Sequence, residues 1–162
     1  MEFKTLVLGI GNNLLSDEGA GVHVIRFLQE RHPRLPGVEY LDGGTLSFTL
    51  AEPIAQADGL IVVDAARLDA EPGTVRLFED EAMDRYLLGN RSSVHEVGIT
   101  DLLDMARLTG VMPEHRCLVG IQPQSLGWGD SPTPVVAAAI PQAAHLVLER
   151  IKAWGSRVGS SA

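Results

Sequence analysis

The segment Gly59-Leu60-Ile61-Val62-Val63-Asp64 decides the fold class of this chain. Its five apolar residues are followed by an acid, which is typical of a strand that is buried on both faces and ends at the edge of a sheet. A second apolar run, Thr5 to Ile10, ends at Gly11-Asn12-Asn13. Two such strands predict a sheet that is covered by helices on both sides.

Helical and extended patterns alternate around these two strands. We expect a helix that starts at Ser16, with Ser16 as its N-cap, and that stops at Pro33. The other predicted elements are a strand over residues 38–42, a helical stretch over 45–57 disturbed at Pro53, a strand over 74–78, a helix over 97–109, a strand over 118–121 and a helix over 135–154 in which Pro141 either makes a kink or starts a new helix.

This order of elements predicts an α/β fold, a three-layer α/β/α sandwich around a largely parallel sheet. Residues 74–78 alternate apolar and polar side chains, which indicates a half-exposed edge strand. Because no repeat or linker divides the chain, we expect residues 1–154 to form a single domain and residues 155–162 to form a loose, flexible tail.

The composition restricts the partners and the compartment. The chain has 162 residues, of which 45% are hydrophobic, and a net charge of −8 that repels nucleic acid. No stretch approaches the roughly 18 consecutive apolar residues of a membrane span, so no membrane association is expected. The one cysteine, Cys117, cannot form an internal disulfide, and its apolar neighbours predict a buried structural thiol. We therefore expect a cytoplasmic protein.

Acidic residues stand where the predicted strands end, at the edge where α/β sheets bind ligands. Asp17 and Glu18 follow the first strand, Asp42 ends the second and Asp64 ends the third. Each has a structural alternative, because acids at a helix start complement the helix dipole and acids at strand ends cap turns.

The remaining polar candidate is His95, which precedes the predicted helix over residues 97–109 and suits a metal ligand, a base or an ordinary loop position. Common catalytic motifs are incomplete: Leu14 replaces the third glycine of a dinucleotide loop, Ile99 replaces the second histidine of HExxH, and GxSxG does not occur. An Asp/Glu/His set of this kind suits a divalent metal with open positions.

Six motifs, in this order, resemble those of the hydrogenase maturation proteases. They are GIGNNLLSDEG at residues 9–19, DGGT at 42–45, VVDA at 62–65, PGT at 72–74, SVHEVG at 93–98 and VGIQP at 119–123. The resemblance extends from about Leu6 to Trp154. Members of this family are endopeptidases that trim the C-terminal extension from the large subunit of nickel-iron hydrogenases.

The resemblance implies roles for individual residues. Glu18, Asp64 and His95 are the implied nickel contacts and catalytic residues, and Asp42, in the loop with Gly43 and Gly44, is implied in recognising the nickel-loaded precursor. It also implies a twisted five-stranded sheet with one antiparallel strand. Since the large-subunit precursor brings the nickel, we expect that precursor as the partner, no tightly bound cofactor, and a monomeric enzyme.

Two other functions use the same residues. A small-molecule metallohydrolase would hold its own metal in the free state. A non-catalytic nickel-binding maturation factor usually carries a His-rich or Cys-rich tract, whereas the five histidines of this chain are scattered.

Overall fold

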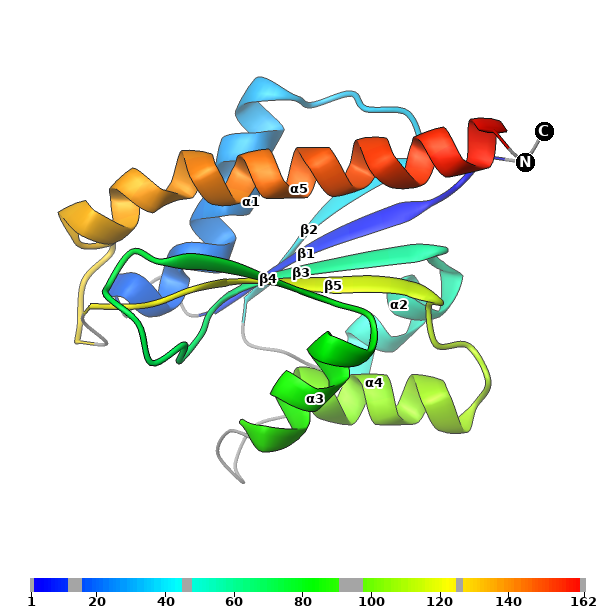
Figure 1. Cartoon of the computed structure of the whole chain (residues 1–162), viewed down its shortest axis with the longest axis horizontal. Coiled ribbons are helices and arrows are strands. Elements are labelled where there is room, and N and C mark those ends of the chain that lie inside the picture. The colour runs from blue at the N-terminus through cyan, green and yellow to red at the C-terminus, as the bar shows by residue number, and fades with distance from the viewer. Residues whose placement is uncertain (1, 12–15, 45–47, 91–97, 125–126, 161–162) are drawn as a thin grey trace.

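A computed structural model describes residues 2–11, 16–44, 48–90, 98–124 and 127–160 of the chain (Figure 1). Along the chain these residues form β1 (Thr5–Ile10), η1 (Ser16–Gly19), α1 (Ala20–Arg31), β2 (Val38–Gly44), η2 (Phe48–Leu50), α2 (Ala51–Gln56), β3 (Gly59–Ala65), β4 (Val75–Glu79), α3 (Glu81–Gly89), α4 (Ile99–Leu108), β5 (His115–Ile121) and α5 (Pro134–Ser160), where η marks a short 3-10 helix. Helices α1 and α5 cover one face of the sheet, and α2, α3 and α4 cover the other. The predicted three-layer α/β/α fold is confirmed.

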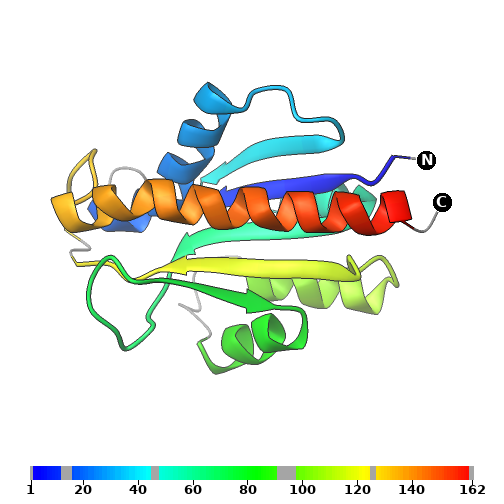
Figure 2. The ribbon, with the colours of Figure 1, turned by 45° about the horizontal axis from the view of Figure 1, so that its top comes forward.

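The sheet has the strand order β2-β1-β3-β5-β4 (Figure 2). Strands β1, β2, β3 and β5 are parallel, whereas β4 pairs antiparallel with β5 at the edge. This confirms the prediction of one antiparallel strand, in the segment whose alternating pattern indicated an edge.

Successive side chains of the central strands enter different cores. Val7, Ile61 and Val63 pack toward α1 and α5, while Leu8, Leu60 and Val62 pack toward α2, α3 and α4. A strand alternates its side chains between the two faces, so two helical layers require an uninterrupted apolar run.

Helix α1 approaches the sheet so closely that its backbone lies against two strands. A Cβ atom at Gly21 would clash with the carbonyl oxygens of Val63 and Ile10, and one at Gly9 would clash with Ile25. The absence of a side chain at Gly21 permits this close approach. The contact places the start of α1, and η1 before it, at the carboxyl ends of β1 and β3.

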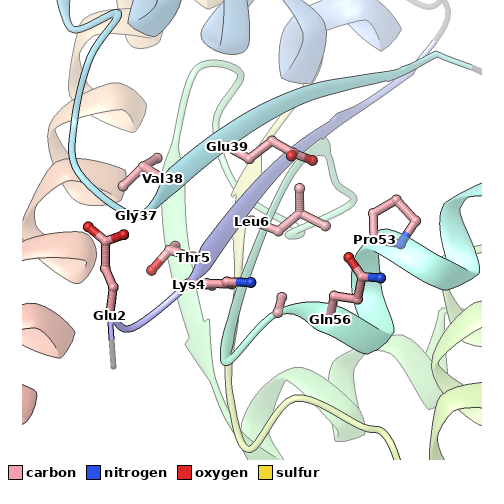
Figure 3. Close-up of a pocket in the computed structure, with 10 residues that line it drawn as sticks. Glu2, Lys4, Thr5, Leu6, Gly37, Val38, Glu39, Pro53 and Gln56 are labelled. Carbon is pink, nitrogen blue, oxygen red and sulfur yellow. The ribbon is translucent and has the colours of Figure 1, made fainter.

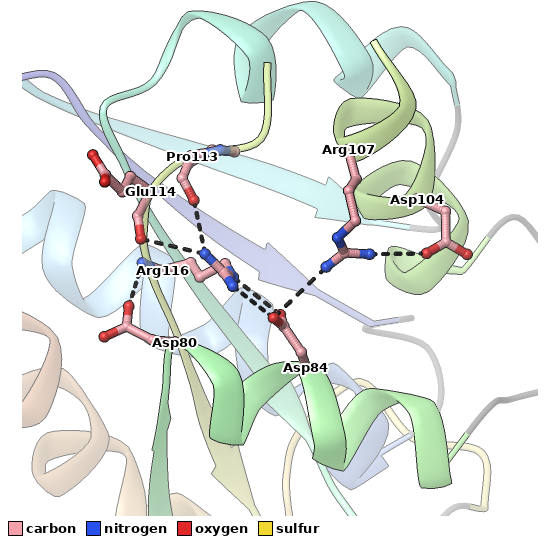
Figure 4. A network of polar contacts seen from close by, with 7 residues as sticks. All are labelled: Asp80, Asp84, Asp104, Arg107, Pro113, Glu114 and Arg116. Atoms are coloured by element: carbon pink, nitrogen blue, oxygen red, sulfur yellow. Dashed lines mark hydrogen bonds and ion pairs between the residues drawn. The ribbon is translucent and has the colours of Figure 1, made fainter. Parts of the chain in front are cut away.

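An ion-pair network holds α3, α4 and β5 together (Figure 4). The Asp84 carboxylate accepts hydrogen bonds from Nε and Nη2 of Arg116 at 3.0 and 2.6 Å, and its Oδ2 lies 3.7 Å from Nη2 of Arg107. The same Arg107 binds Asp104 on α4 at 3.2 Å. The network ties the two helices to the amino end of β5.

The N-terminal helix starts differently from the prediction. Ser16 is not an N-cap: the 3-10 turn η1 precedes α1, and Gly19 occupies the cap position without a side-chain hydrogen bond. The reason is tertiary, because Ser16 and Asp17 use their polar groups to bind the distant segment 124–133.

Helix α3 is absent from the sequence prediction. It has nine residues and buries only Met83 and Leu87. It begins after Asp80, which has a φ of +49° and makes no side-chain capping hydrogen bond. A helix this short and without a cap has a weak sequence pattern.

Two prolines and the C-terminus also differ in detail. Pro53 lies in the first turn of α2, where its missing N–H has no helical partner to lose. Helix α5 runs through Pro141 without a break and extends to Ser160, beyond the predicted end at residue 154, and the flexibility expected of residues 155–162 stays a prediction. Gly155 lowers helix propensity by only about 1 kcal/mol, and no proline follows it.

None of the described helices, the 27-residue α5 included, combines the length and apolar character needed to cross a membrane.

Candidate functional site

The order of the strands places a topological switch point between β1 and β3. The chain leaves β1 for β2 on one side and then returns to β3 on the other, so the connections after β1 and β3 diverge. Ligands of open α/β sheets bind at such a switch point, beyond the carboxyl ends of the strands. The structure places η1 with Glu18 after β1, and Asp64 near the end of β3, at this point.

Asp64 lines a cavity of about 420 Å³. The other walls come from the segment after β3, from Tyr86 and Leu87 on α3, and from Ile99 and Thr100 on α4. Burial raises the pKa of the Asp64 carboxyl well above its usual range, and the negative charge of Glu18 raises it further. A hydrogen bond from the backbone N–H of Ala65 opposes this shift only in part.

The two predicted carboxylates therefore lie close enough to repel each other. Protonation of one relieves this repulsion, and so does a cation bound between them. Glu18 and Asp64 are both half-buried residues.

Asp17, the neighbour of Glu18, is fully buried and has a structural role. Its Oδ2 accepts a hydrogen bond from the amide of Gln124 at 2.8 Å, and its Oδ1 accepts one from the amide of Thr133 at 2.6 Å. The Thr133 hydroxyl lies 3.0 and 2.9 Å from the same two oxygens. This role has no local signal, because the partners lie 107 and 116 residues away in the sequence.

His95 lies outside the described residues. Asn90, the last described residue before its segment, and Ile99, the second described residue after it, both line the cavity of Asp64. Across the described ranges, His, Cys, Asp and Glu side chains form no group of three that could hold a metal ion.

Asp42 lies in β2 opposite Gly9 of β1, and its Oδ1 accepts a hydrogen bond from the amide of Gly44 at 2.9 Å. The carbonyl of Gly44 accepts another from the amide of Gly11 at 3.1 Å. The structure thus bears out the turn-forming role of Asp42 while leaving its side chain exposed. Strand β2 continues through Gly43 and Gly44, beyond the predicted end at residue 42.

Two further features carry no candidate chemistry. Cys117 is fully buried, as predicted, and burial raises the pKa of its thiol to about 12, so it is not a nucleophile at neutral pH. A second hollow of about 300 Å³ lies at the opposite edge of the sheet, where Figure 3 shows Lys4, Glu39 and Gln56 around it.

Comparisons with known proteins agree with this architecture. The family model described as hydrogenase maturation protease matches residues 22–150. The hydrogenase 2 maturation protease of Escherichia coli K12 is 39% identical to the chain over 154 residues, which is 94% of this chain and 93% of that protein. The hydrogenase expression/formation protein HoxM of Cupriavidus necator is 37% identical over 151 residues, covering 93% and 75%.

A solved structure shows the same likeness in three dimensions. The hydrogenase maturating endopeptidase HybD from Escherichia coli superimposes on this chain with a TM-score of 0.87, at 38% identity, and 94% of each chain is covered.

Proposed function

The chain belongs to the hydrogenase maturation protease family, and we propose that it removes the C-terminal extension of a nickel-iron hydrogenase large-subunit precursor once nickel has been inserted. The observation that carries this proposal is the pair Glu18 and Asp64, two carboxylates that repel each other at the switch point of the sheet and beside an open cavity.

A pair of carboxylates of this kind is a weak metal-binding site by itself. Two repelling carboxylates lack the four ligands of a stable structural metal centre. A divalent ion delivered by another polypeptide, and already held by that polypeptide's own thiolates, needs only a few further ligands. We propose that Glu18, Asp64 and His95 supply them when the precursor binds, so that the substrate completes the site.

Coordination then couples recognition to cleavage. The nickel ion of the substrate reports that insertion is finished and fixes the scissile peptide against the protein. Its charge serves to polarise the peptide carbonyl or to activate water. The buried Cys117 thiol is excluded as a nucleophile by its burial and raised pKa, in keeping with cleavage that proceeds without a thiol intermediate.

Asp42 is proposed to discriminate between precursors. It is exposed and held by Gly44, and the carbonyl of Gly44 is bound to Gly11 at the start of the connection that leads to Glu18. Its negative charge at this place disfavours a precursor tail that presents no compensating metal ion. A cytoplasmic location also belongs to this proposal, because the single cysteine is compatible with a reducing compartment.

The test is a cleavage assay with the nickel-loaded precursor of the same organism, in which the product masses are measured. The wild type should release one C-terminal peptide, and Glu18→Gln should release none. Glu114→Gln is the matched control, because this exposed acid precedes β5 at the opposite edge of the sheet and should leave cleavage unchanged. An uncut precursor with the wild type would refute the proposed function.

Elemental analysis of the purified protein distinguishes the proposed protease from a small-molecule metallohydrolase. An enzyme that receives nickel with its substrate should contain little bound metal, whereas stoichiometric zinc that survives a mild chelator would favour the metallohydrolase.

A further inference from the structure

An exposed tryptophan stands on the segment that follows β5. The side chain of Trp128 is 84% exposed, whereas the other tryptophan of the chain, Trp154, is 4% exposed and belongs to the core. Tryptophan is a highly buried residue on average, because its ring carries a large apolar surface. The folding of this domain therefore leaves the surface of Trp128 in contact with water.

The segment that carries Trp128 is bound to the residues beside Glu18. The carbonyl of Gly129 accepts a hydrogen bond from the amide of Ser16 at 2.7 Å, and the carbonyl of Ser131 accepts one from the Ser16 hydroxyl at 3.3 Å. Asp17 holds Gln124 and Thr133, one on each side of Trp128 in the sequence. The position of the ring is thus coupled to η1, which carries Glu18.

The surroundings of Trp128 in the sequence make the ring accessible. Gly127 and Gly129 precede and follow it, so neither neighbour has a side chain that covers the ring. The indole offers an apolar face and one N–H donor, which match the apolar side chains and the carbonyl oxygens of a polypeptide. Tryptophan is also enriched among the residues that dominate the affinity of protein interfaces.

We propose that Trp128 is a substrate-binding residue that contacts an apolar side chain of the precursor close to the segment that is cut. This inference rests on the proposed function and adds to it a contact that does not involve nickel. The aromatic contact contributes to the affinity for the precursor, whereas Glu18 and Asp64 contact the nickel that the precursor carries.

Steady-state kinetics with the nickel-loaded precursor test the proposal. Trp128→Ala should raise KM about 30-fold, equivalent to about 2 kcal/mol of binding, and should leave kcat within about twofold. Trp128→Phe should restore most of the affinity, because phenylalanine keeps an aromatic face. The unfolding temperature of both variants should equal that of the wild type, because the side chain is exposed.

Leu108→Ala is the matched control. Leu108 is 88% exposed and ends α4, from which the chain passes to the amino end of β5, away from the candidate site. This variant should leave KM unchanged. An unchanged KM in Trp128→Ala would overturn the role of Trp128 while leaving the proposed function intact. A wild type that cuts no precursor would instead refute the proposed function.

A spectroscopic measurement locates the contact directly. Incorporation of 5-fluorotryptophan gives one fluorine resonance for Trp128 and one for Trp154, and Trp128→Phe assigns them. Saturation of the Asp64→Asn variant, which should not cut, with unlabelled nickel-loaded precursor, with complex formation verified by sedimentation, should shift only the Trp128 resonance. Two unshifted resonances in the complex would overturn the proposal.

Discussion

The buried carboxylate of Asp17 accepts a hydrogen bond from the amide of Thr133 at 2.6 Å, across 116 residues of sequence. The contact joins the connection after β1 to the connection before α5. Because Glu18 follows Asp17 directly, the position of a proposed catalytic carboxylate depends on a hydrogen bond to the C-terminal part of the chain.

Replacing Asp17 with alanine should destabilise the fold. The change leaves the amides of Gln124 and Thr133 without their carboxylate acceptor, which costs about 3 kcal/mol and lowers the unfolding temperature by about 6–12 °C. Thr133→Val keeps the amide and removes only the hydroxyl, so it should cost about 1 kcal/mol. Thermal unfolding followed by circular dichroism measures both, and an Asp17→Ala variant as stable as the wild type would show that these bonds contribute nothing.

Glu18→Gln and Asp64→Asn should affect precursor cleavage and not stability, in contrast to Asp17→Ala. Each should abolish precursor cleavage without lowering the unfolding temperature, because each removes one of two carboxylates that repel each other in the free protein. Cleavage assays and thermal unfolding of the same preparations measure the two effects. Loss of the unfolding transition would reassign these residues to structural caps.

The ion pair between Asp84 and Arg116 should make stability depend on pH in the acid range. The hydrogen bond from Arg116 lowers the pKa of Asp84 in the folded protein below its value in the unfolded chain, near 3.8. The folded state therefore binds fewer protons, so the stabilisation is present above about pH 4 and is lost as the pH falls through the folded-state pKa.

Asp84→Asn tests this dependence. It should lower the unfolding free energy by about 1–2 kcal/mol at pH 7 and by less at pH 3, as urea unfolding at the two pH values measures. Asp104→Asn is the control: its carboxylate is 43% exposed and pairs with Arg107, which is 50% exposed, so its effect should be small at both pH values. Equal losses of unfolding free energy at pH 7 and pH 3 for Asp84→Asn would show that its ion pair with Arg116 does not cause the pH dependence.

Asp42→Asn should relax the nickel requirement. Removal of the charge keeps an oxygen that can accept the hydrogen bond from Gly44, so the turn should persist while the repulsion of a metal-free tail is lost. The measurement is the ratio of cleavage rates with nickel-loaded and nickel-free precursor, which should fall toward one. An unchanged ratio with a large loss of rate would assign Asp42 to catalysis or folding.

Much of the fold was predictable because its central strands are apolar on both faces. Such runs, at residues 5–10 and 59–63, occur where helices cover both sides of a sheet, and the alternation over residues 74–78 marks an edge. Helix α3 was not predicted, because it buries few side chains and has no cap.

The candidate site was predictable in part. Glu18 and Asp64 lie at strand ends that the topology brings together, and the charge of Glu18 raises the pKa of Asp64, but their roles stay predictions. The tertiary role of Asp17 was not predictable, because local sequence cannot reveal hydrogen bonds to Gln124 and Thr133. The role assigned to His95 stays a prediction.

The central claim is that nickel in the precursor is the feature that the enzyme recognises. The most direct measurement compares nickel-loaded and nickel-free forms of one large-subunit precursor, incubated with excess wild-type enzyme, by the mass of the products. The account predicts complete removal of the C-terminal extension from the loaded form and no cleavage of the metal-free form. Equal cleavage of both forms would contradict it.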